Sequence, residues 1–291
     1  MSDHFWGNLD ELKNFCLTIG IENKNFEKLI GVNCISNIFS DKNHTLTFIK
    51  DKKFLDKAVS NENIAVIITN ILDIDTRSQI ILVDDPEFTY WSLFEYKQSL
   101  NKLTKPSYIS PLAKIGKNVS ISTTNVQISD GVKIGDNVTI NSNCFIDINS
   151  NIGPNSVISS TGFLVKNTIY GKKIISHTGW AKIGKNVTTG ALCTINQGLQ
   201  EDTFIGDHTS IDCGVHIAHN CNIGTKNIIT AHVTCGGSVN TGTEVFIGLG
   251  AILINRISIG SHSHIGAGCI VTRSYFEKVK LLGYPAKSVS F

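Results

Sequence analysis

The sequence predicts a mainly β protein in which a small α/β domain precedes a parallel β-solenoid. Three observations lead to this prediction. An aliphatic residue recurs at every sixth position in the second half of the 291-residue chain, the first hundred residues lack this repeat, and glycine is frequent at 25 while proline is rare at 5. Frequent glycine suits many turns, and the composition excludes a disordered or collagen-like chain.

The charge balance excludes several classes of partner. Lys plus Arg number 26 and Asp plus Glu number 24, which gives a net charge of +2 and argues against nucleic acid or an anionic membrane as the main partner. The N-terminus lacks a secretory signal pattern, and the most apolar stretch, residues 64–72, is about half of the ~20 residues that a membrane helix needs. We therefore expect a soluble, cytoplasmic protein without membrane insertion.

The first hundred residues alternate helical and strand patterns, which predicts a small α/β domain. Amphipathic or helix-favouring segments and short apolar segments follow each other along this part of the chain. The predicted helices are 9–18, 51–60 and 86–100, and the predicted strands are 45–49, 64–69 and 79–83. The eight cysteines form no CxxC pair, so we expect reduced and mostly buried thiols.

The six-residue repeat defines the second half. Stepping by six from Ile205 to Val271 meets an aliphatic residue at ten of twelve positions, and the following residue is usually small. Such a hexad describes a short strand and a tight corner, so three hexads make one 18-residue turn of a triangular solenoid. We predict domains at 1–105, 106–272 and 273–291, the last being a C-terminal cap. The repeat breaks at 160–182 and again between 195 and 199.

The repeat and one local segment resemble a known family. Hexads of this style are similar to the left-handed β-helix, hexapeptide-repeat acyltransferases, and the resemblance supplies the handedness. The segment KIGKNVTTGALCTINQGLQEDTFIGDHTSIDCGVHIAHNCNIG resembles the catalytic coils of the UDP-3-O-acylglucosamine N-acyltransferases. The resemblance implies that the histidine of IAHN, His219, is the general base. A histidine suits this task because its pKa near 6.5 permits proton transfer near neutral pH.

Spacing then nominates neighbours of His219. Residues 18 positions apart stack on successive coils, so Glu201 is expected one coil before His219 and Gly237 one coil after it. Gly237 with Gly236 would leave bare backbone for an acyl thioester. Asp212 matches an acid of the family, and either carboxylate could orient the imidazole. His216, in the same segment as His219, is a candidate substrate contact.

One position departs from the family pattern. The family has a second histidine in a VINGH segment, where this sequence reads LINRI and places Arg256. We expect Arg256 to face a pantetheine or a phosphate. Zinc is not expected, because His216, His232, His262 and His264 have neither the 18-residue spacing nor the five-residue spacing that would make ligands converge.

The N-terminal domain of the same family holds a uracil base between two aromatic residues six positions apart. Phe48 and Phe54 have this spacing, so the resemblance implies that they bind the base of a nucleotide-linked sugar. A phenylalanine in the place of the family's usual second tyrosine leaves the identity of the base open. The alternative is that both rings belong to the core.

The C-terminal segment indicates the acyl donor. IGAGCIVTR followed by GYPAK resembles the end of CoA-dependent sugar acetyltransferases, in which the backbone of this motif borders the cofactor; the corresponding residues here are Gly283, Pro285 and Ala286. Four residues follow GYPAK, which is too short for a helix that docks an acyl carrier protein. We therefore expect acyl-CoA, with acetyl-CoA as the favoured donor, and cations such as Lys278 and Lys280 for its phosphates.

Together these features predict a homotrimeric acyl-CoA-dependent N-acyltransferase that acts on a nucleotide-linked amino sugar for surface polysaccharide synthesis, with no metal. Three alternatives stay open at this point. The first is UDP-3-O-acylglucosamine N-acyltransferase itself, with an acyl carrier protein as donor. The second is an O-acetyltransferase, and the third is a non-catalytic β-helix that binds a nucleotide sugar or scaffolds a partner.

Overall fold

The computed structural model describes residues 5–100 and 104–283. Its contacts divide the chain into two compact units. The α/β unit contains residues 1–103 together with 163–175, and the β-helix unit contains residues 104–162 and 176–291. The α/β unit is therefore built from two stretches of chain, and the second stretch falls inside the region where the hexad repeat is lost.

The α/β unit has one parallel four-stranded sheet in the order β1-β2-β3-β4. Its strands are β1 (Cys34–Ile35), β2 (Thr45–Ile49), β3 (Ile64–Thr69) and β4 (Gln79–Leu82). Its helices are α1 (Leu9–Thr18), α2 (Asn23–Ile30), a 3₁₀ turn at Lys52–Phe54, α3 (Leu55–Ser60) and α4 (Pro86–Leu100). The predicted strands and the helices at 9–18 and 86–100 are confirmed, while α2 was not predicted and the predicted 51–60 helix begins as a 3₁₀ turn.

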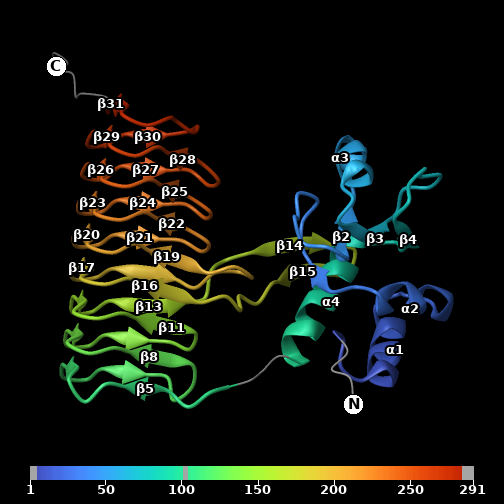
Figure 1. The fold of residues 1–291 in the computed structure, drawn as a ribbon, viewed down its shortest axis with the longest axis horizontal. Helices are drawn as coiled ribbons and strands as arrows, with labels where there is room; N and C mark the ends of the chain where they lie inside the picture. The colour runs from blue at the N-terminus through green and yellow to red at the C-terminus, as the bar shows by residue number, and fades with distance from the viewer. Residues whose placement is uncertain (1–4, 101–103, 284–291) are drawn as a thin grey trace, which may run out of the picture. The chain divides into compact units, whose positions relative to one another are not determined.

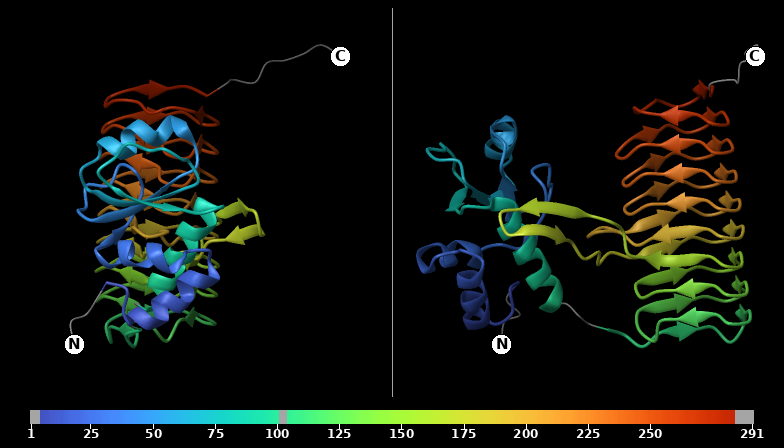
Figure 2. Two further views of the ribbon diagram at one scale, coloured as in Figure 1. Left: turned by 90° about the vertical axis from the view of Figure 1, so that its right-hand side faces the viewer. Right: turned by 180° about the vertical axis from the view of Figure 1, so that it is seen from behind.

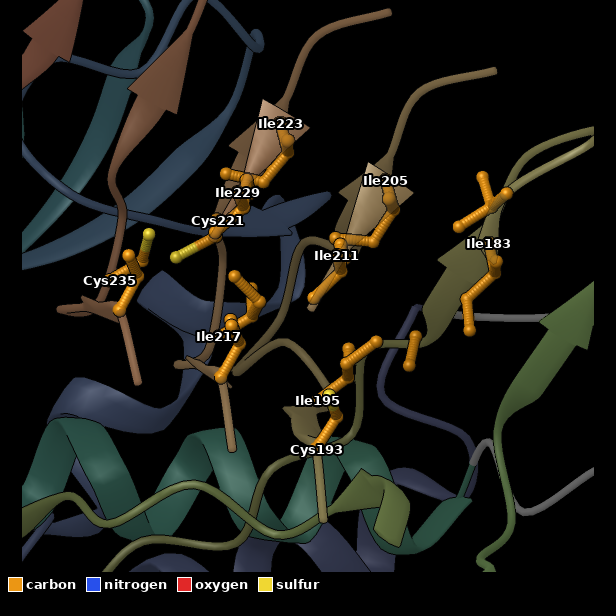
Figure 3. Packing of buried hydrophobic residues seen from close by; sticks show 14 of the residues in the cluster. Ile183, Cys193, Ile195, Ile205, Ile211, Ile217, Cys221, Ile223, Ile229 and Cys235 are labelled. Carbon is orange, nitrogen blue, oxygen red and sulfur yellow. The ribbon is translucent and has the colours of Figure 1, made fainter. Parts of the chain in front are cut away.

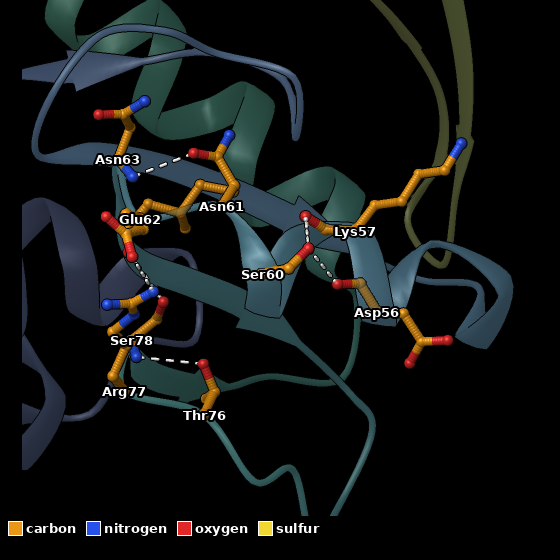
Figure 4. A network of polar contacts seen from close by, with 10 residues as sticks. Asp56, Lys57, Ser60, Asn61, Glu62, Asn63, Thr76, Arg77 and Ser78 are labelled. Carbon is orange, nitrogen blue, oxygen red and sulfur yellow. Dashed lines mark hydrogen bonds and ion pairs between the residues drawn. The ribbon is translucent and has the colours of Figure 1, made fainter.

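Side-chain hydrogen bonds hold the turn between α3 and β3. The Ser60 hydroxyl donates to the carbonyls of Asp56 and Lys57 at the end of α3, and the Asn63 N–H donates to the Asn61 side chain (Figure 4). These bonds satisfy backbone groups that the end of a helix leaves without partners. The turn from α3 into the central strand is thereby fixed.

A β-hairpin completes the α/β unit. Strands β14 (Val165–Thr168) and β15 (Gly171–Ile174) pair in antiparallel register, and Figure 1 shows them as a projecting ribbon. The carboxylate of Asp85, which is 4% exposed, accepts the N–H of Phe88 in the first turn of α4 and the N–H of Ile169 at the hairpin tip. Lys166 and Lys173 form ion pairs with Glu87 and Glu95 of α4. This helix thus holds the hairpin by hydrogen bonds and charge.

The second unit is a left-handed parallel β-helix, as predicted. Three sheets of eight, eight and nine short strands run along its three faces, and successive coils stack one on another (Figures 1 and 2). The ladder advances by 18 residues a coil in most of the stack, as in the pairs His216 with Thr234 and Asn222 with Asn240. The hexad prediction of register is therefore confirmed.

The first strands of this unit lie at its N-terminal end. They are β5 (Tyr108–Ile109), β6 (Lys114–Ile115), β7 (Ser120–Ile121), β8 (Val126–Ile128), β9 (Lys133–Ile134), β10 (Thr139–Ile140), β11 (Cys144–Ile146), β12 (Asn151–Ile152), β13 (Val157–Ser160), β16 (Ala181–Ile183), β17 (Thr188–Thr189) and β18 (Thr194–Asn196). The later strands are β19 (Thr203–Ile205), β20 (Ser210–Ile211), β21 (His216–Ile217), β22 (Asn222–Ile223), β23 (Ile228–Ile229), β24 (Thr234–Cys235), β25 (Asn240–Thr241), β26 (Phe246–Ile247), β27 (Ile252–Leu253), β28 (Ser258–Ile259), β29 (His264–Ile265), β30 (Ile270–Val271) and β31 (Lys280–Leu281). Strand β31 pairs with β29, so the sheets extend beyond residue 272.

The hexad residues fill the interior of the coils. Ile217, Ile223 and Ile229 are at most 1% exposed and lie on the three different faces of one coil (Figure 3). Cys221 and Cys235 belong to the same buried cluster of side chains, and burial raises the pKa of the Cys221 thiol to about 11. Six of the eight cysteines are buried, one is half-buried and one, Cys213, is exposed. Most of these thiols therefore act as small apolar core residues.

The corners favour asparagine. A corner of the coil needs a residue at positive φ, which asparagine tolerates better than other side chains that carry a Cβ atom. Corner asparagines on successive coils also bond to each other, as Asn118 does to Asn137 and Asn137 to Asn155. The residues of this type are Asn118, Asn125, Asn137, Asn143, Asn149, Asn155, Asn186 and Asn220.

Candidate active site

His219 lies at the corner that joins β21 to β22 and is half-buried. The strand residue Ile217 points into the core, so the chain turns outward directly after it and presents the imidazole at the edge of two faces. His219 is therefore partly accessible to solvent. This placement suits a group that must exchange a proton with a bound molecule.

The neighbouring Asn220 fixes the tautomer of His219. The Asn220 Oδ1 atom accepts the backbone N–H of Leu199 at 3.0 Å, and its Nδ2 atom donates to the carbonyl of Glu201 at 2.9 Å. Backbone groups have fixed donor and acceptor roles, so the amide orientation is determined. The same Oδ1 lies 2.9 Å from His219 Nδ1, and an oxygen can only accept. The ring proton is therefore on Nδ1, and Nε2 carries the lone pair that a general base uses.

Gly237 lies against the imidazole one coil later. A Cβ atom at this position would fall 2.8 Å from both Cε1 and Nε2 of His219, which is closer than real Cβ contacts. The absence of a side chain is therefore what allows the ring to occupy its place. The Gly236 N–H donates to the carbonyl of Leu253 in the coil ladder, whereas the Gly237 N–H donates no hydrogen bond among the described residues.

A second histidine, His177, packs against His219. Its ring centroid lies 5.0 Å from that of His219 at an interplanar angle of 67°, an edge-to-face arrangement, and its side chain is 5% exposed. Sequence reasoning missed it because it lies in the 160–182 break, where no register could be assigned. The segment SHTGW that follows the hairpin was the available signal.

A local insertion joins the two histidine segments. Thr194 pairs with His216 across 22 residues where the ladder normally takes 18, so four extra residues lie between β18 and β19. Within this loop, Gln197 donates its side-chain amide to the carbonyl of His177 at 2.9 Å. Leu199 and Glu201, from the same loop, bind Asn220. The second break in the hexads therefore holds the candidate site together.

Similarity to curated proteins extends over about half of the chain. The chain is 33% identical over 135 residues to "UDP-3-O-acylglucosamine N-acyltransferase" of Janthinobacterium sp. (strain Marseille), covering 46% of this chain and 38% of that protein. It is 34% identical over 135 residues to the protein of the same name from Wolinella succinogenes, covering 46% and 42%. The match thus spans about two fifths of the length of these relatives. Over this part of its length, the chain is similar to the left-handed β-helix acyltransferases.

The chain is also partly similar to solved structures. The structure "UDP-N-acetylglucosamine acyltransferase from Campylobacter jejuni" is 27% identical, covers 60% of this chain and 68% of its own, and has a TM-score of 0.36. PerB from Caulobacter crescentus, solved in complex with CoA and GDP-perosamine, is 16% identical, covers 85% and 97%, and has a TM-score of 0.22. No family model matches this chain.

The two carboxylates expected to orient His219 do not take that position within the described chain. Asp212 accepts the N–H of the adjacent Cys213 at 2.7 Å, and Glu201 meets Asn220 through its backbone carbonyl while its side chain is exposed. Spacing located the Glu201 backbone correctly. The position beside Nδ1 is instead held by Asn220, because the four extra residues bring backbone rather than a carboxylate to this corner.

The other predicted residues of the β-helix occupy varied positions. His216 lies on β21 between Thr194 and Thr234, and burial lowers its pKa below the usual 6.5. Arg256 is exposed at a corner with φ 63°, and its N–H donates to the Gly237 carbonyl. Gly283 packs against the carbonyl of Ala267. Pro285 and Ala286 lie outside the described residues.

Phe48 and Phe54 lie in the α/β unit and have different environments. Phe48, on β2, is half-buried and packs on Tyr90 of α4 with ring centroids 4.8 Å apart. Phe54 ends the 3₁₀ turn, is 40% exposed, and has the Lys53 Nζ atom 4.9 Å from its ring centroid. Phe54 is thus a surface ring, while Phe48 has a packing role as well as a partly open face.

Residues 5–100 and 104–283 contain no group of three His, Cys, Asp or Glu side chains that could hold a metal ion. In the same part of the chain, no helix combines the length and the apolar character that crossing a bilayer needs.

Proposed function

We propose that the protein is an N-acyltransferase that transfers an acyl group from acyl-CoA to the amine of a nucleotide-linked amino sugar. The observation that carries this proposal is the His219 corner, where Asn220 holds the proton on Nδ1 and leaves Nε2 as a base beside Gly237. Curated relatives at 33% and 34% identity are named N-acyltransferases, which supports the same reaction type.

The proposed step uses the base twice. The amine lone pair of the sugar attacks the thioester carbonyl and forms the new C–N bond, while His219 Nε2 takes a proton from that nitrogen. The tetrahedral intermediate collapses, the C–S bond breaks, and the imidazolium returns the proton to the leaving sulfur. The products are an amide and the free thiol of CoA. The Gly237 N–H is the proposed donor to the oxyanion, since the Gly236 N–H already belongs to the coil ladder.

The α/β unit is proposed to bind the nucleotide. Phe48 and Phe54 are both partly accessible, and stacking on a base face contributes roughly 1–3 kcal/mol per base in nucleic-acid binders. Within the β-helix, we assign His216 to the sugar and Arg256 with the Gly283 segment to the CoA.

We further propose a homotrimer in the cytoplasm that serves surface polysaccharide synthesis. Exposed aliphatic side chains on the face that contains β21 support association. Ile252 and Ile270 pair on adjacent coils there and are 42% and 67% exposed. The solution mass, measured by sedimentation equilibrium, tests the trimer.

The primary test measures thiol release with acetyl-CoA and a panel of UDP-, dTDP- and GDP-linked amino sugars. His219→Gln should lower turnover by about 10²–10⁴, the range for a lost general base, with an unchanged thermal midpoint. His208→Gln is the matched control, because His208 is an exposed corner histidine. Wild-type turnover in folded His219→Gln would contradict the mechanism.

The named relatives favour a second candidate, UDP-3-O-acylglucosamine N-acyltransferase with an acyl carrier protein as donor. Assaying acetyl-CoA and 3-hydroxyacyl carrier protein at equal concentration separates the two. A higher kcat/KM with the carrier protein would assign the second function. A product that hydroxylamine cleaves would instead be an ester and would indicate O-acetylation, while nucleotide-sugar binding without turnover would indicate a binding protein.

A further inference from the structure

We infer that His177 is a positioning residue of the candidate site, which holds the plane of the His219 ring by edge-to-face packing. The inference rests on the proposed function, because it assigns His177 to the orientation of the proposed base. Such an arrangement of two aromatic rings is favourable beyond the burial of their surfaces.

Three contacts restrain His219, and each restrains a different movement. Asn220 fixes the position of Nδ1 through a hydrogen bond of 2.9 Å. Gly237 lies beside Cε1 and Nε2. A single hydrogen bond at Nδ1 still permits the ring to tilt about that bond. The His177 ring, at 5.0 Å and 67°, occupies the space into which the tilt would carry the imidazole.

His177 is itself firmly placed. A Cβ atom on Gly162 would fall 2.4 Å from His177 Nε2, so the absence of a side chain at 162 makes room for this ring. Gln197 binds the His177 carbonyl, and the Gln197 N–H donates to the carbonyl of Ser160. Gly162 precedes the hairpin and His177 follows it, so both ends of that excursion meet at the ring.

If His177 restrains the His219 ring, replacing His177 should change both the motion of that ring and the rate of the reaction. Misplacement of a catalytic group by about 1 Å can cost 10²-fold in rate, while substrate binding elsewhere is unaffected. We therefore expect His177→Ala to lower kcat about tenfold to hundredfold with KM values for both substrates near wild type. His177→Phe retains an aromatic edge and should keep most of the turnover.

The readout that does not depend on activity is ¹⁵N NMR of histidine-labelled protein, with the His219 signals assigned by comparison with His219→Gln. All variants should keep the proton on Nδ1, because Asn220 sets the tautomer. Wild type and His177→Phe should show a rigid His219 ring in ¹⁵N relaxation, whereas His177→Ala should show increased motion of that ring. Gly162→Ala, which pushes a methyl group onto His177, should resemble His177→Ala in both measurements. Gly31→Ala is its control, because nothing lies within 4 Å of the added atom.

Three results would overturn the inference. They are unchanged His219 ring motion and kcat in folded His177→Ala, equal losses in His177→Phe and His177→Ala, or wild-type behaviour of Gly162→Ala. If no acyl transfer is found with any donor, the proposed function fails, but the NMR comparison still decides whether His177 positions His219.

Discussion

At the scale of single residues, an amide takes the place usually given to a carboxylate. Asn220 accepts from Leu199 and His219 with one atom and donates to Glu201 with the other. A carboxylate would place a second acceptor opposite the Glu201 carbonyl, where two oxygens would repel. The corner also needs φ near 59°, which asparagine tolerates. Asparagine therefore adopts the positive φ of the corner, binds two backbone groups of the loop and accepts the Nδ1–H of His219.

The first prediction tests this residue. Asn220→Gly keeps the positive φ without strain but removes all three side-chain bonds. We expect turnover to fall about tenfold to hundredfold, because the His219 tautomer is released. We also expect the free energy of unfolding to fall by about 1–3 kcal/mol, because three hydrogen bonds are lost. Steady-state kinetics and urea unfolding measure the two effects.

The control is Asn186→Gly at another corner with φ 55°. No hydrogen bond from its side chain is found among the described residues, so that variant should match wild type in both measurements. If Asn220→Gly retains full turnover, Asn220 does not set the tautomer that the mechanism uses.

The second prediction concerns His216 and pH. Burial lowers its pKa in the folded chain below 6.5, so at slightly acid pH the folded chain binds fewer protons at this site than the unfolded chain does. Its contribution to stability is complete above about pH 6.5 and is lost as pH falls through the lower folded pKa. Urea unfolding between about pH 7 and about pH 5 should therefore show a smaller loss for His216→Gln than for wild type.

In this experiment, His208→Gln controls for a histidine-to-glutamine substitution at an exposed corner. If the unfolding free energy changes equally with pH in wild type and in His216→Gln, burial of His216 does not contribute to the pH dependence of stability.

At the scale of elements, the sequence predicted what is periodic and missed what interrupts the period. Every sixth residue predicted the buried positions of Ile217, Ile223 and Ile229, because a solenoid repeats the same burial in each coil. The hairpin of β14 and β15 could not be predicted from that rule. Its stabilising partners are on α4, some 80 residues earlier, and a single sequence does not show which distant segments meet.

The same difference between regular and irregular segments separates the site residues that were predicted from those that were missed. His219 and Gly237 were found because they lie in regular coils 18 residues apart. His177 and Asn220 were missed for two different reasons. His177 lies beyond the hairpin where the register is lost, and Asn220 looks like one of the many corner asparagines whose role is only to turn the chain. Its hydrogen bonds depend on a four-residue insertion whose conformation no periodicity encodes.

The third prediction concerns the junction of α4 with the hairpin. Asp85→Ala removes the acceptor of the Phe88 N–H and of the Ile169 N–H. Loss of a helix cap costs about 1 kcal/mol and loss of a further bond about as much, so we expect the α/β unit to lose about 1–3 kcal/mol. Protease sensitivity of the hairpin and thermal unfolding report this loss.

Asp84→Ala is the matched control, since Asp84 is exposed beside Asp85. Its hairpin should resist protease as wild type does. If Asp85→Ala resists equally well, the carboxylate does not hold the hairpin to the helix.

At the scale of the whole molecule, the two units are proposed to serve one reaction with separate tasks, the α/β unit binding the nucleotide and the β-helix carrying the base. Such a division implies that substitutions in one unit change one kinetic constant and leave others alone.

The fourth prediction follows from that division. Phe54→Ala should raise the KM for the nucleotide sugar roughly tenfold through lost stacking, with little change in the KM for acyl-CoA or in stability. Phe39→Ala is a close control, because Phe39 is likewise exposed and has the Lys57 Nζ atom 5.3 Å from its ring centroid. Equal changes in both KM values, or an effect of Phe39→Ala as large as that of Phe54→Ala, would argue against base stacking.

Because the α/β unit is built from two separate stretches of chain, the order of synthesis on the ribosome affects how this unit folds. Synthesis runs from the N-terminus, so residues 1–100 emerge first, yet their hairpin partner at 163–175 emerges only after the first coils at 104–162. Until then, Asp85, which precedes α4, and Glu87 and Glu95, which lie on it, lack the hairpin groups that they bind in the finished unit. The α/β unit can therefore be completed only once coil assembly has begun, and a recombination event that exchanged residues 1–103 alone would leave that hairpin facing a foreign helix.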